Sequence, residues 1–398
     1  MRKKLVSLLL VGTLAVTMLA GCGSGNSGTA ADGGAAADDG VAADAGDASD
    51  AGESNADADG GSKVSGKIAM ITDSGDITDE SFNQITWETC VAYGEANDIE
   101  TGYYKPADDT DEERINAIDM SIKEGATIVV MPGYLFGPAI AEEQSVYPDV
   151  SFVAVDVTEF DVVNLSGESV GIEDNVYICS FQEEQAGYLA GYAAVKDGYT
   201  SLGFLGGMAV PAVIRYGYGY VQGIDAAAEE LGADVDVKYY YGGQFYGDAT
   251  ITARMEGWYA DGTEIVFACG GGIYTSAVDA AGEYDGKVIG VDVDQHPVLG
   301  DVCVTSAMKG LSSAVNSALD AYFTGNWASI GGKSEQLGLT QGDYLGLPTD
   351  SASWGFETFT TAEYEEILSG IKDGSIAISS DTENQPQVGS HTSVSYIE

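Results

Sequence analysis

Basic side chains are scarce in this sequence. Its 398 residues include 16 Lys and Arg and two His against 63 Asp and Glu, for a formal net charge of −47 at pH 7. Nucleic acids and anionic membrane surfaces are polyanions, and such a protein surface repels them. The composition argues against a nucleic-acid partner, and any hold on a membrane has to come from a lipid.

Motifs of metal, nucleotide and hydrolase sites are also missing. Four cysteines stand apart in apolar contexts with no CxxC spacing: Cys90, Cys179, Cys269 and Cys303. A zinc site needs Cys and His groups closer together, and the "GGG" turn lacks the Lys-Ser/Thr of a phosphate loop. No spacing specifies a catalytic carboxylate pair. We predict no metal, no cofactor and no catalytic residue, and we interpret the four cysteines as buried side chains, with a disulfide as the alternative.

No apolar run reaches the roughly 20 residues of a membrane-spanning helix. The first one, Leu5 to Ala20, follows a basic start and is typical of an export signal over residues 1–21. The tetrapeptide "LAGC" resembles the lipobox of bacterial lipoproteins, which implies a lipid-modified Cys22 at the mature N-terminus. We expect a protein anchored on the outer face of the cell membrane; the alternative is an ordinary signal cleaved before a cysteine.

Aromatic and basic residues are absent from residues 23–62, which are mainly Gly, Ala, Ser and Asp. Such a segment has little to bury and repels itself. We predict a disordered acidic tether over residues 22–62, with no functional residue beyond the lipidated cysteine.

Apolar strand-like runs alternate with helical patterns through the rest of the chain. Seven runs are strand candidates: 67–72, 127–133, 151–157, 201–207, 235–243, 264–271 and 287–294. Helical patterns lie between and after them: 80–97, 111–124, 136–146, 183–197, 211–231, 248–260, 273–284, 311–325 and 359–374. This alternation predicts an α/β protein with parallel sheets covered on both faces, and the length favours two doubly wound lobes. Ligands of such sheets bind beyond the carboxyl ends of the strands, where polar turns such as "TDSGD" gather.

Four segments carry a resemblance to a known family. In chain order, "DSGDITDESFNQ", "GFLGGMAVPAVIRYGYGYVQGI", "IGVDVDQ" and "TSAMKG" resemble signature segments of the basic membrane lipoprotein family, over about Lys67 to Asp373. Those proteins are substrate-binding lipoproteins of ABC importers, several of them specific for purine nucleosides. The resemblance implies a type I periplasmic-binding-protein fold, whose two lobes are joined by three crossings and close on the ligand through a hinge. It also implies an ABC permease as partner, and we expect a monomer.

The same resemblance sets the expected lobe boundaries. We predict an N-terminal lobe from residues 63–182 plus about 307–345. The C-terminal lobe is expected from residues 183–306 plus about 346–398.

A flat, uncharged, hydroxylated ligand needs aromatic faces, an amide or carboxylate at its edge, and carboxylates with a cation for its hydroxyls. The motifs supply these groups in Phe82, Asn83, Phe245, Asp292 and Lys309. An acid-rich, base-poor loop such as "TDSGDITDESFNQ" suits such a ligand and would repel a phosphorylated one. Each residue also has a purely structural alternative, such as packing, a turn or an ion pair.

By resemblance, two aromatics match the pair that sandwiches a nucleoside base, Phe82 and Phe245. Asp73 and Asn83 match the polar contacts to that base. One position departs from the family pattern, because Pro138 stands where a base-reading Asp is expected, and proline has no polar side chain.

The ribose contacts implied by the resemblance are Gly272, Asp292 and Lys309, which completes the predicted ligand site. The sequence therefore predicts a binding protein for a nucleoside, with a purine base favoured. A sugar or a free base as ligand, or a lipoprotein that senses a ligand without transporting it, stays open as an alternative, with an exported hydrolase third.

Overall fold

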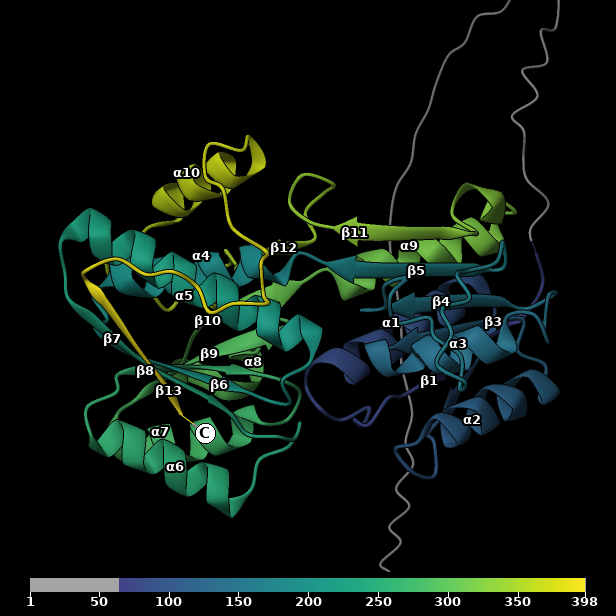
Figure 1. The fold of residues 1–398 in the computed structure, drawn as a ribbon, viewed down its shortest axis with the longest axis horizontal. Coiled ribbons are helices and arrows are strands. Elements are labelled where there is room, and N and C mark those ends of the chain that lie inside the picture. The colour runs from purple at the N-terminus through teal and green to yellow at the C-terminus, as the bar shows by residue number, and fades with distance from the viewer. Residues whose placement is uncertain (1–63, 398) are drawn as a thin grey trace, which may run out of the picture. The chain divides into compact units, whose positions relative to one another are not determined.

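The computed structural model describes residues 64–397. The predicted signal, the lipidated Cys22 and the tether lie outside these residues. Strands and helices alternate along the described chain, and the strands form two sheets (Figure 1). None of the helices in this part of the chain combines the length and apolar character needed to cross a membrane.

The first sheet has six parallel strands in the order β11-β5-β4-β3-β1-β2. Its strands are β1 (Lys67–Ile71), β2 (Glu100–Tyr104), β3 (Ile128–Pro132), β4 (Ser151–Val155), β5 (Val176–Phe181) and β11 (Lys333–Leu337). The associated helices are α1 (Phe82–Asn97), α2 (Asp111–Lys123), α3 (Gly137–Glu143) and α9 (Leu311–Phe323), with the short 3-10 turns η1 (Tyr134–Phe136) and η3 (Trp327–Ser329). Helices α2 and α3 share one buried cluster with the sheet, and α1 and α9 share the other, so both faces are covered.

The second sheet has seven strands in the order β12-β10-β9-β8-β6-β7-β13, parallel except for β12. Its strands are β6 (Ser201–Gly206), β7 (Val235–Tyr241), β8 (Ile265–Cys269), β9 (Lys287–Asp292), β10 (Cys303–Lys309), β12 (Leu345–Gly346) and β13 (Thr392–Ile397). Its helical elements are α4 (Glu183–Asp197), α5 (Pro211–Leu231), α6 (Ala249–Ala260), α7 (Tyr274–Tyr284), α8 (His296–Leu299), η2 (Gly300–Val302) and α10 (Thr361–Lys372). Figure 1 shows α4 and α5 on one face of this sheet and α6 and α7 on the other.

The chain passes between the two sheets three times. It leaves the first sheet after β5 and enters the second through α4, and it returns between β10 and α9. The third passage joins β11 to β12. Such doubly wound parallel sheets with repeated crossings are the predicted α/β architecture, and the fold class is confirmed.

Helices α4 and α5 touch backbone to backbone, and glycine is the reason. A Cβ added at Gly219 would lie 1.9 Å from the carbonyl oxygen of Glu184, and one added at Gly187 would lie 2.1 Å from that of Tyr216. Any side chain at these positions would push the helices apart. The "RYGYGYVQGI" segment therefore holds the N-termini of α4 and α5 close together, and both ends carry charged residues of the site described below.

All seven predicted strands and the predicted helices are present, and six strands were not predicted. Strand β2 reads "ETGYY" and is only partly buried, so it lacks the apolar signal of a central strand. Strand β5 is buried throughout but passes into α4 after a single residue, with no turn signal to separate them. The four described cysteines are buried and free, which confirms the interpretation as small buried side chains and excludes a disulfide among them.

Candidate functional site

The carboxyl ends of strands from both sheets open into one cleft of about 590 Å³. The turns after β1, β2, β3 and β4 line it from the first sheet. The second sheet contributes the turns after β6, β7 and β8 and the last residues of β9 and β10. The seven residues predicted for ligand binding all line this cleft: Asp73, Phe82, Asn83, Phe245, Gly272, Asp292 and Lys309. Residues separated by more than 200 positions in the chain thus come together in one place.

Two aromatic side chains enter the cleft from different sheets. Phe82 is the first residue of α1, and the Lys309 ammonium lies 4.8 Å from the centroid of its ring. Phe245 follows β7 and lies against glycine backbone: a Cβ built on Gly207 would come within 2.5 Å of its Cδ1. The Phe245 carbonyl also accepts a hydrogen bond from the Gly272 amide at 2.9 Å. Gly207, together with Gly270 of the "CGGG" turn, where a Cβ would lie 3.0 Å from the same Cδ1 carbon, leaves room for the Phe245 ring in the cleft lining.

A carboxylate and amide network follows β1. The Asp79 carboxylate accepts hydrogen bonds from the backbone amides of Ser81, Asn83 and Gln84, and it orders the start of α1. The Asn83 amide nitrogen donates to both Asp73 Oδ1 and Asp79 Oδ2, each at 3.1 Å. Burial raises the pKa of Asp73 to about 6, against the hydrogen bonds from Gly75 and Asn83 that lower it. This end of the cleft is therefore acidic and presents mostly hydrogen-bond acceptors.

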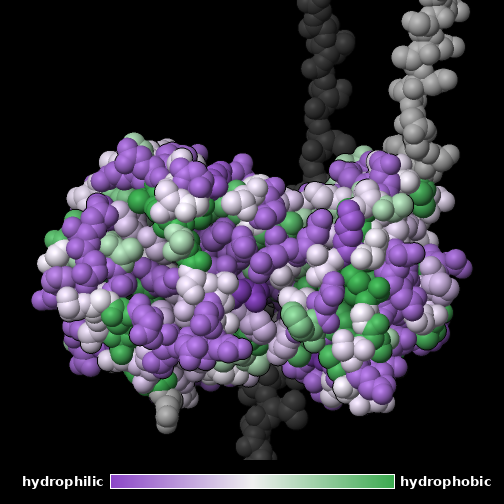
Figure 2. Space-filling view, turned by 45° about the horizontal axis from the view of Figure 1, so that its top comes forward, coloured by the Kyte–Doolittle hydropathy of each residue, from purple (hydrophilic) through white to green (hydrophobic). Residues whose placement is uncertain are grey.

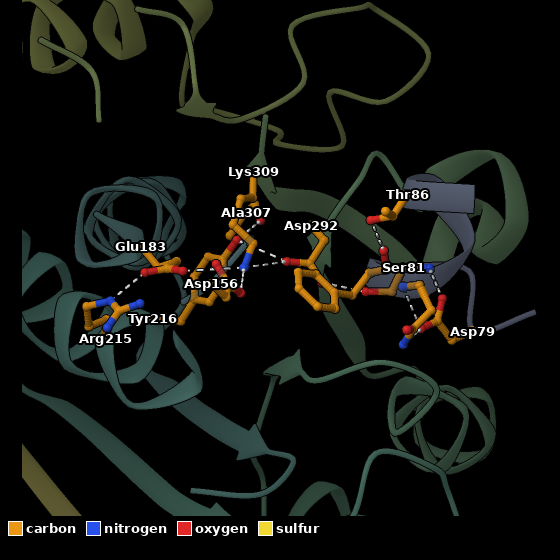
Figure 3. Close-up of polar contacts among 12 residues, drawn as sticks. Asp79, Ser81, Thr86, Asp156, Glu183, Arg215, Tyr216, Asp292, Ala307 and Lys309 are labelled. Atoms are coloured by element: carbon orange, nitrogen blue, oxygen red, sulfur yellow. Dashed lines mark hydrogen bonds and ion pairs between the residues drawn. The ribbon is translucent and has the colours of Figure 1, made fainter. Parts of the chain in front are cut away.

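Lys309 is the centre of a buried charge cluster (Figure 3). Its Nζ lies 2.6 Å from Asp156 Oδ2, 3.3 Å from Glu183 Oε1 and 3.7 Å from Asp292 Oδ1. Burial alone lowers the pKa of Lys309, but the three carboxylates raise it above its usual value, so the ammonium stays charged. Arg215 Nε donates to the other Glu183 oxygen at 2.5 Å. Three carboxylates thus share two cations.

Each carboxylate oxygen of Asp292 accepts one hydrogen bond from within the protein. Its Oδ2 accepts a hydrogen bond from Ser81 Oγ at 2.6 Å, and its Oδ1 accepts one from the Tyr216 hydroxyl at 3.3 Å (Figure 3). The Ser81 contact ties a turn after the first sheet to a strand end of the second. A second hydrogen bond between the two sides runs from Gln295 Nε2, the donor, to the Glu80 carbonyl oxygen at 2.9 Å. These two bonds hold the opposing walls of the cleft together.

Sequence reasoning missed two of the three carboxylates around Lys309, Asp156 and Glu183, and also missed Arg215. Asp156 directly follows β4 within "VDV" and has a left-handed backbone with φ 61°. Asp292 is the last residue of β9, within another "VDV", with φ 65°. The repeated tripeptide at two strand ends is the signal that identifies Asp156. Glu183 is the first residue of α4, and Arg215 lies near the start of α5. Only the close α4–α5 contact brings them to the cluster, so no local pattern marks them.

Two expectations about the cleft need correction. Pro138, expected in place of a base-reading Asp, is not among the cleft-lining residues; its loop instead contributes Gly133, Tyr134 and Leu135. Lys309 was the one cation named for the ligand site, but Lys105 also lines the cleft, and its ammonium pairs with Asp76 at 2.7 Å, where both side chains are half exposed. Both lysines are therefore already paired with carboxylates.

The lining as a whole is strongly acidic. Six carboxylates line the cleft with the two paired lysines: Asp73, Asp76, Asp79, Asp109, Asp156 and Asp292. Within residues 64–397 no three His, Cys, Asp or Glu side chains are grouped to hold a metal ion. Outside the cleft, Figure 2 shows hydrophilic residues over most of the visible face, with hydrophobic ones in small separate groups. The arrangement can hold an uncharged ligand rich in hydrogen-bond donors.

Comparisons with known proteins agree with this geometry. A family model described as ABC transporter substrate-binding protein, PnrA-like, matches residues 67–380. The ABC transporter nucleoside-binding protein BmpA of Lactococcus lactis is 27% identical over 311 residues, 74% of this chain and 75% of that protein. Basic membrane protein B of Borreliella burgdorferi is 28% identical over 290 residues, 71% of this chain and 80% of that protein.

Solved structures show the same fold. An ABC transporter solute-binding protein from Aeropyrum pernix matches with a TM-score of 0.64 at 19% identity, covering 78% of this chain and 87% of that one. One from Conexibacter woesei matches with a TM-score of 0.63 at 21% identity, covering 79% and 99%.

Proposed function

Because this chain belongs to the family of PnrA-like ABC transporter substrate-binding proteins, we propose that it captures a nucleoside, with a purine base, for an importer. The single observation that carries this proposal is the pair of aromatic rings, Phe82 and Phe245, which enter one cleft from opposite sheets. A flat base needs such faces, and base–aromatic stacking contributes about 1–3 kcal/mol per base. The printed name of the Lactococcus lactis relative, a nucleoside-binding protein, supports the same ligand class.

The polar residues fit the two halves of a nucleoside. Asp73 and Asn83 stand beside Phe82 and offer acceptors to the edge of a base. Asp292, Lys309 and the Gly272 backbone are the proposed contacts of the ribose. Asp156 joins them, because its Oδ1 is buried in the cleft lining without a hydrogen-bond partner within the described chain. A ribose hydroxyl would satisfy this oxygen.

The electrostatics of the cleft disfavour nucleotides. Both lining lysines are already paired with carboxylates, so a phosphate would be buried among acidic groups without a free cation. The proposed ligand is therefore the nucleoside rather than its monophosphate.

The place of action follows from the family and the N-terminus. ABC transporter substrate-binding proteins deliver a small molecule to a permease outside the cytoplasm. We propose that a lipid on Cys22 anchors this chain on the outer face of the cell membrane, and that it works there as a monomer beside its permease. Ligand capture without chemistry is the proposed role of the cleft.

Calorimetric titration tests the ligand class. Purified protein is titrated with adenosine, guanosine and inosine, with their monophosphates and free bases, and with ribose. We expect the nucleosides to bind more tightly than every other class. Tight binding of a monophosphate, or of ribose alone, would show that the ligand class is wrong.

A further inference from the structure

Asn83 holds one unused acceptor at the wall of the cleft. The residue is 3% exposed and lines the cleft, and its Oδ1 is buried without a hydrogen-bond partner within residues 64–397. Its amide nitrogen is fully used, because it donates to Asp73 and to Asp79. A buried acceptor without a partner is costly unless a ligand supplies the donor.

The orientation of this amide is determined by its neighbours. Ionised carboxylates only accept hydrogen bonds, so the Asn83 nitrogen has to face Asp73 and Asp79. The reversed amide would set its oxygen against two carboxylate oxygens and lose both bonds. The oxygen is therefore the atom available to a ligand.

Asp73 adds a second acceptor at the same end. Its Oδ1 accepts hydrogen bonds from the Gly75 amide at 2.8 Å and from Asn83, whereas its Oδ2 has no donor in the described part of the chain. Gly133 keeps the space beside this oxygen open, because a Cβ there would lie 2.9 Å from Oδ2. The nearby charges are already paired, Lys105 with Asp76 and Asp109 with the buried Arg114.

We infer that this end of the cleft selects a base edge with two adjacent N–H donors, the guanine type, over an edge with one, the hypoxanthine type. The inference rests on the proposed function, since it names the base that the same site prefers. Asn83 Oδ1 and Asp73 Oδ2 accept the two donors. Both residues determine specificity rather than overall capture, which stacking and the ribose contacts supply.

Guanosine and inosine are the matched pair of probes, because they differ only in the 2-amino group. Without that group, one buried acceptor has no partner. We expect guanosine to bind about 5- to 150-fold more tightly than inosine, the fold-change that corresponds to one unsatisfied buried group.

The experiment is calorimetry at pH 8, where Asp73 is ionised, on the wild-type protein and two variants. Asp73→Asn replaces the free acceptor by a group that can donate, so the guanosine-to-inosine affinity ratio should fall toward one. Asp76→Asn is the control: it removes one negative charge from the same loop and leaves the two acceptors, Asn83 Oδ1 and Asp73 Oδ2, in place. It should change both affinities together and leave the ratio unchanged.

The possible failures are distinguishable. Equal binding of guanosine and inosine by the wild-type protein would overturn the inference and leave nucleoside capture standing. An unchanged guanosine-to-inosine affinity ratio in a folded Asp73→Asn variant would overturn the role of Asp73. No binding of either nucleoside would overturn the proposed function and the inference with it.

Discussion

Replacing Lys309 by methionine should destabilise the protein strongly. The Lys309 side chain is 2% exposed and neutralises Asp156 directly, at 2.6 Å. Glu183 keeps Arg215 in the variant, and Asp292 keeps Ser81 and Tyr216, so Asp156 is the group left without a cation. Breaking a buried ion pair in this way costs about 3–5 kcal/mol, a large share of a typical free energy of unfolding of about 5–15 kcal/mol.

Two comparisons isolate the cause. Adding Asp156→Asn to Lys309→Met removes the orphaned charge and keeps its shape, so the double variant should recover more than half of the loss. Lys105→Met breaks a pair in which both side chains are half exposed, and it should cost only about 0–1 kcal/mol. The free energies are measured by urea unfolding followed by tryptophan fluorescence at pH 8. The reasoning is wrong if Lys309→Met costs no more than Lys105→Met, or if the double variant is less stable than the single one.

Three further predictions follow from the same structure. Gly219→Ala should lower the melting temperature markedly, because the added Cβ would meet the Glu184 carbonyl. Gly282→Ala on α7, where nothing lies within 4 Å of the added Cβ, is the control and should be neutral or slightly stabilising. Equal changes in melting temperature for the two variants would contradict the close α4–α5 contact. Burial raises the pKa of Glu143 and Glu184 to about 7 and that of Asp73 to about 6, so the folded protein binds protons more tightly than the unfolded chain. The stability that these three carboxyl groups contribute is fully present below pH 4 and is lost as the pH rises through 7. The melting temperature should therefore be higher at pH 5.5 than at pH 8, and a melting temperature that rises over this range would refute the prediction. Cys22→Ala should move the protein from the membrane fraction to the soluble one, and unchanged fractionation of the variant would exclude the lipid anchor.

The sequence identifies strand ends better than it identifies their partners. Asp73 and Asp292 were recognisable because each stands at the end of a predicted strand, and a parallel sheet brings such ends to one edge. Lys309 was expected only from the resemblance of "TSAMKG", because strand β10 was not predicted. The long-range contacts were not recognisable. Glu183 and Arg215 reach the cluster only through the backbone contact of α4 and α5, which depends on glycines that a local pattern cannot pair.

The strands likewise divide into those that the sequence predicts and those that it does not. Buried central strands such as β3 and β8 carry an apolar run and were predicted, whereas β2 is polar and β13 lies beyond the residues matched by the family model. The acceptor geometry at Asn83 was also beyond the sequence, because it depends on which carboxylates face the amide nitrogen.

The most direct test of capture between two aromatic rings is calorimetry with guanosine on three alanine variants. Phe82→Ala and Phe245→Ala each remove one stacking face, and each should weaken binding about 5- to 150-fold, the equivalent of 1–3 kcal/mol. Phe160→Ala is the matched control, since that side chain is 92% exposed and is not among the cleft-lining residues. Two weakened variants beside an unchanged control are the predicted result; full affinity in both cleft variants would contradict the account.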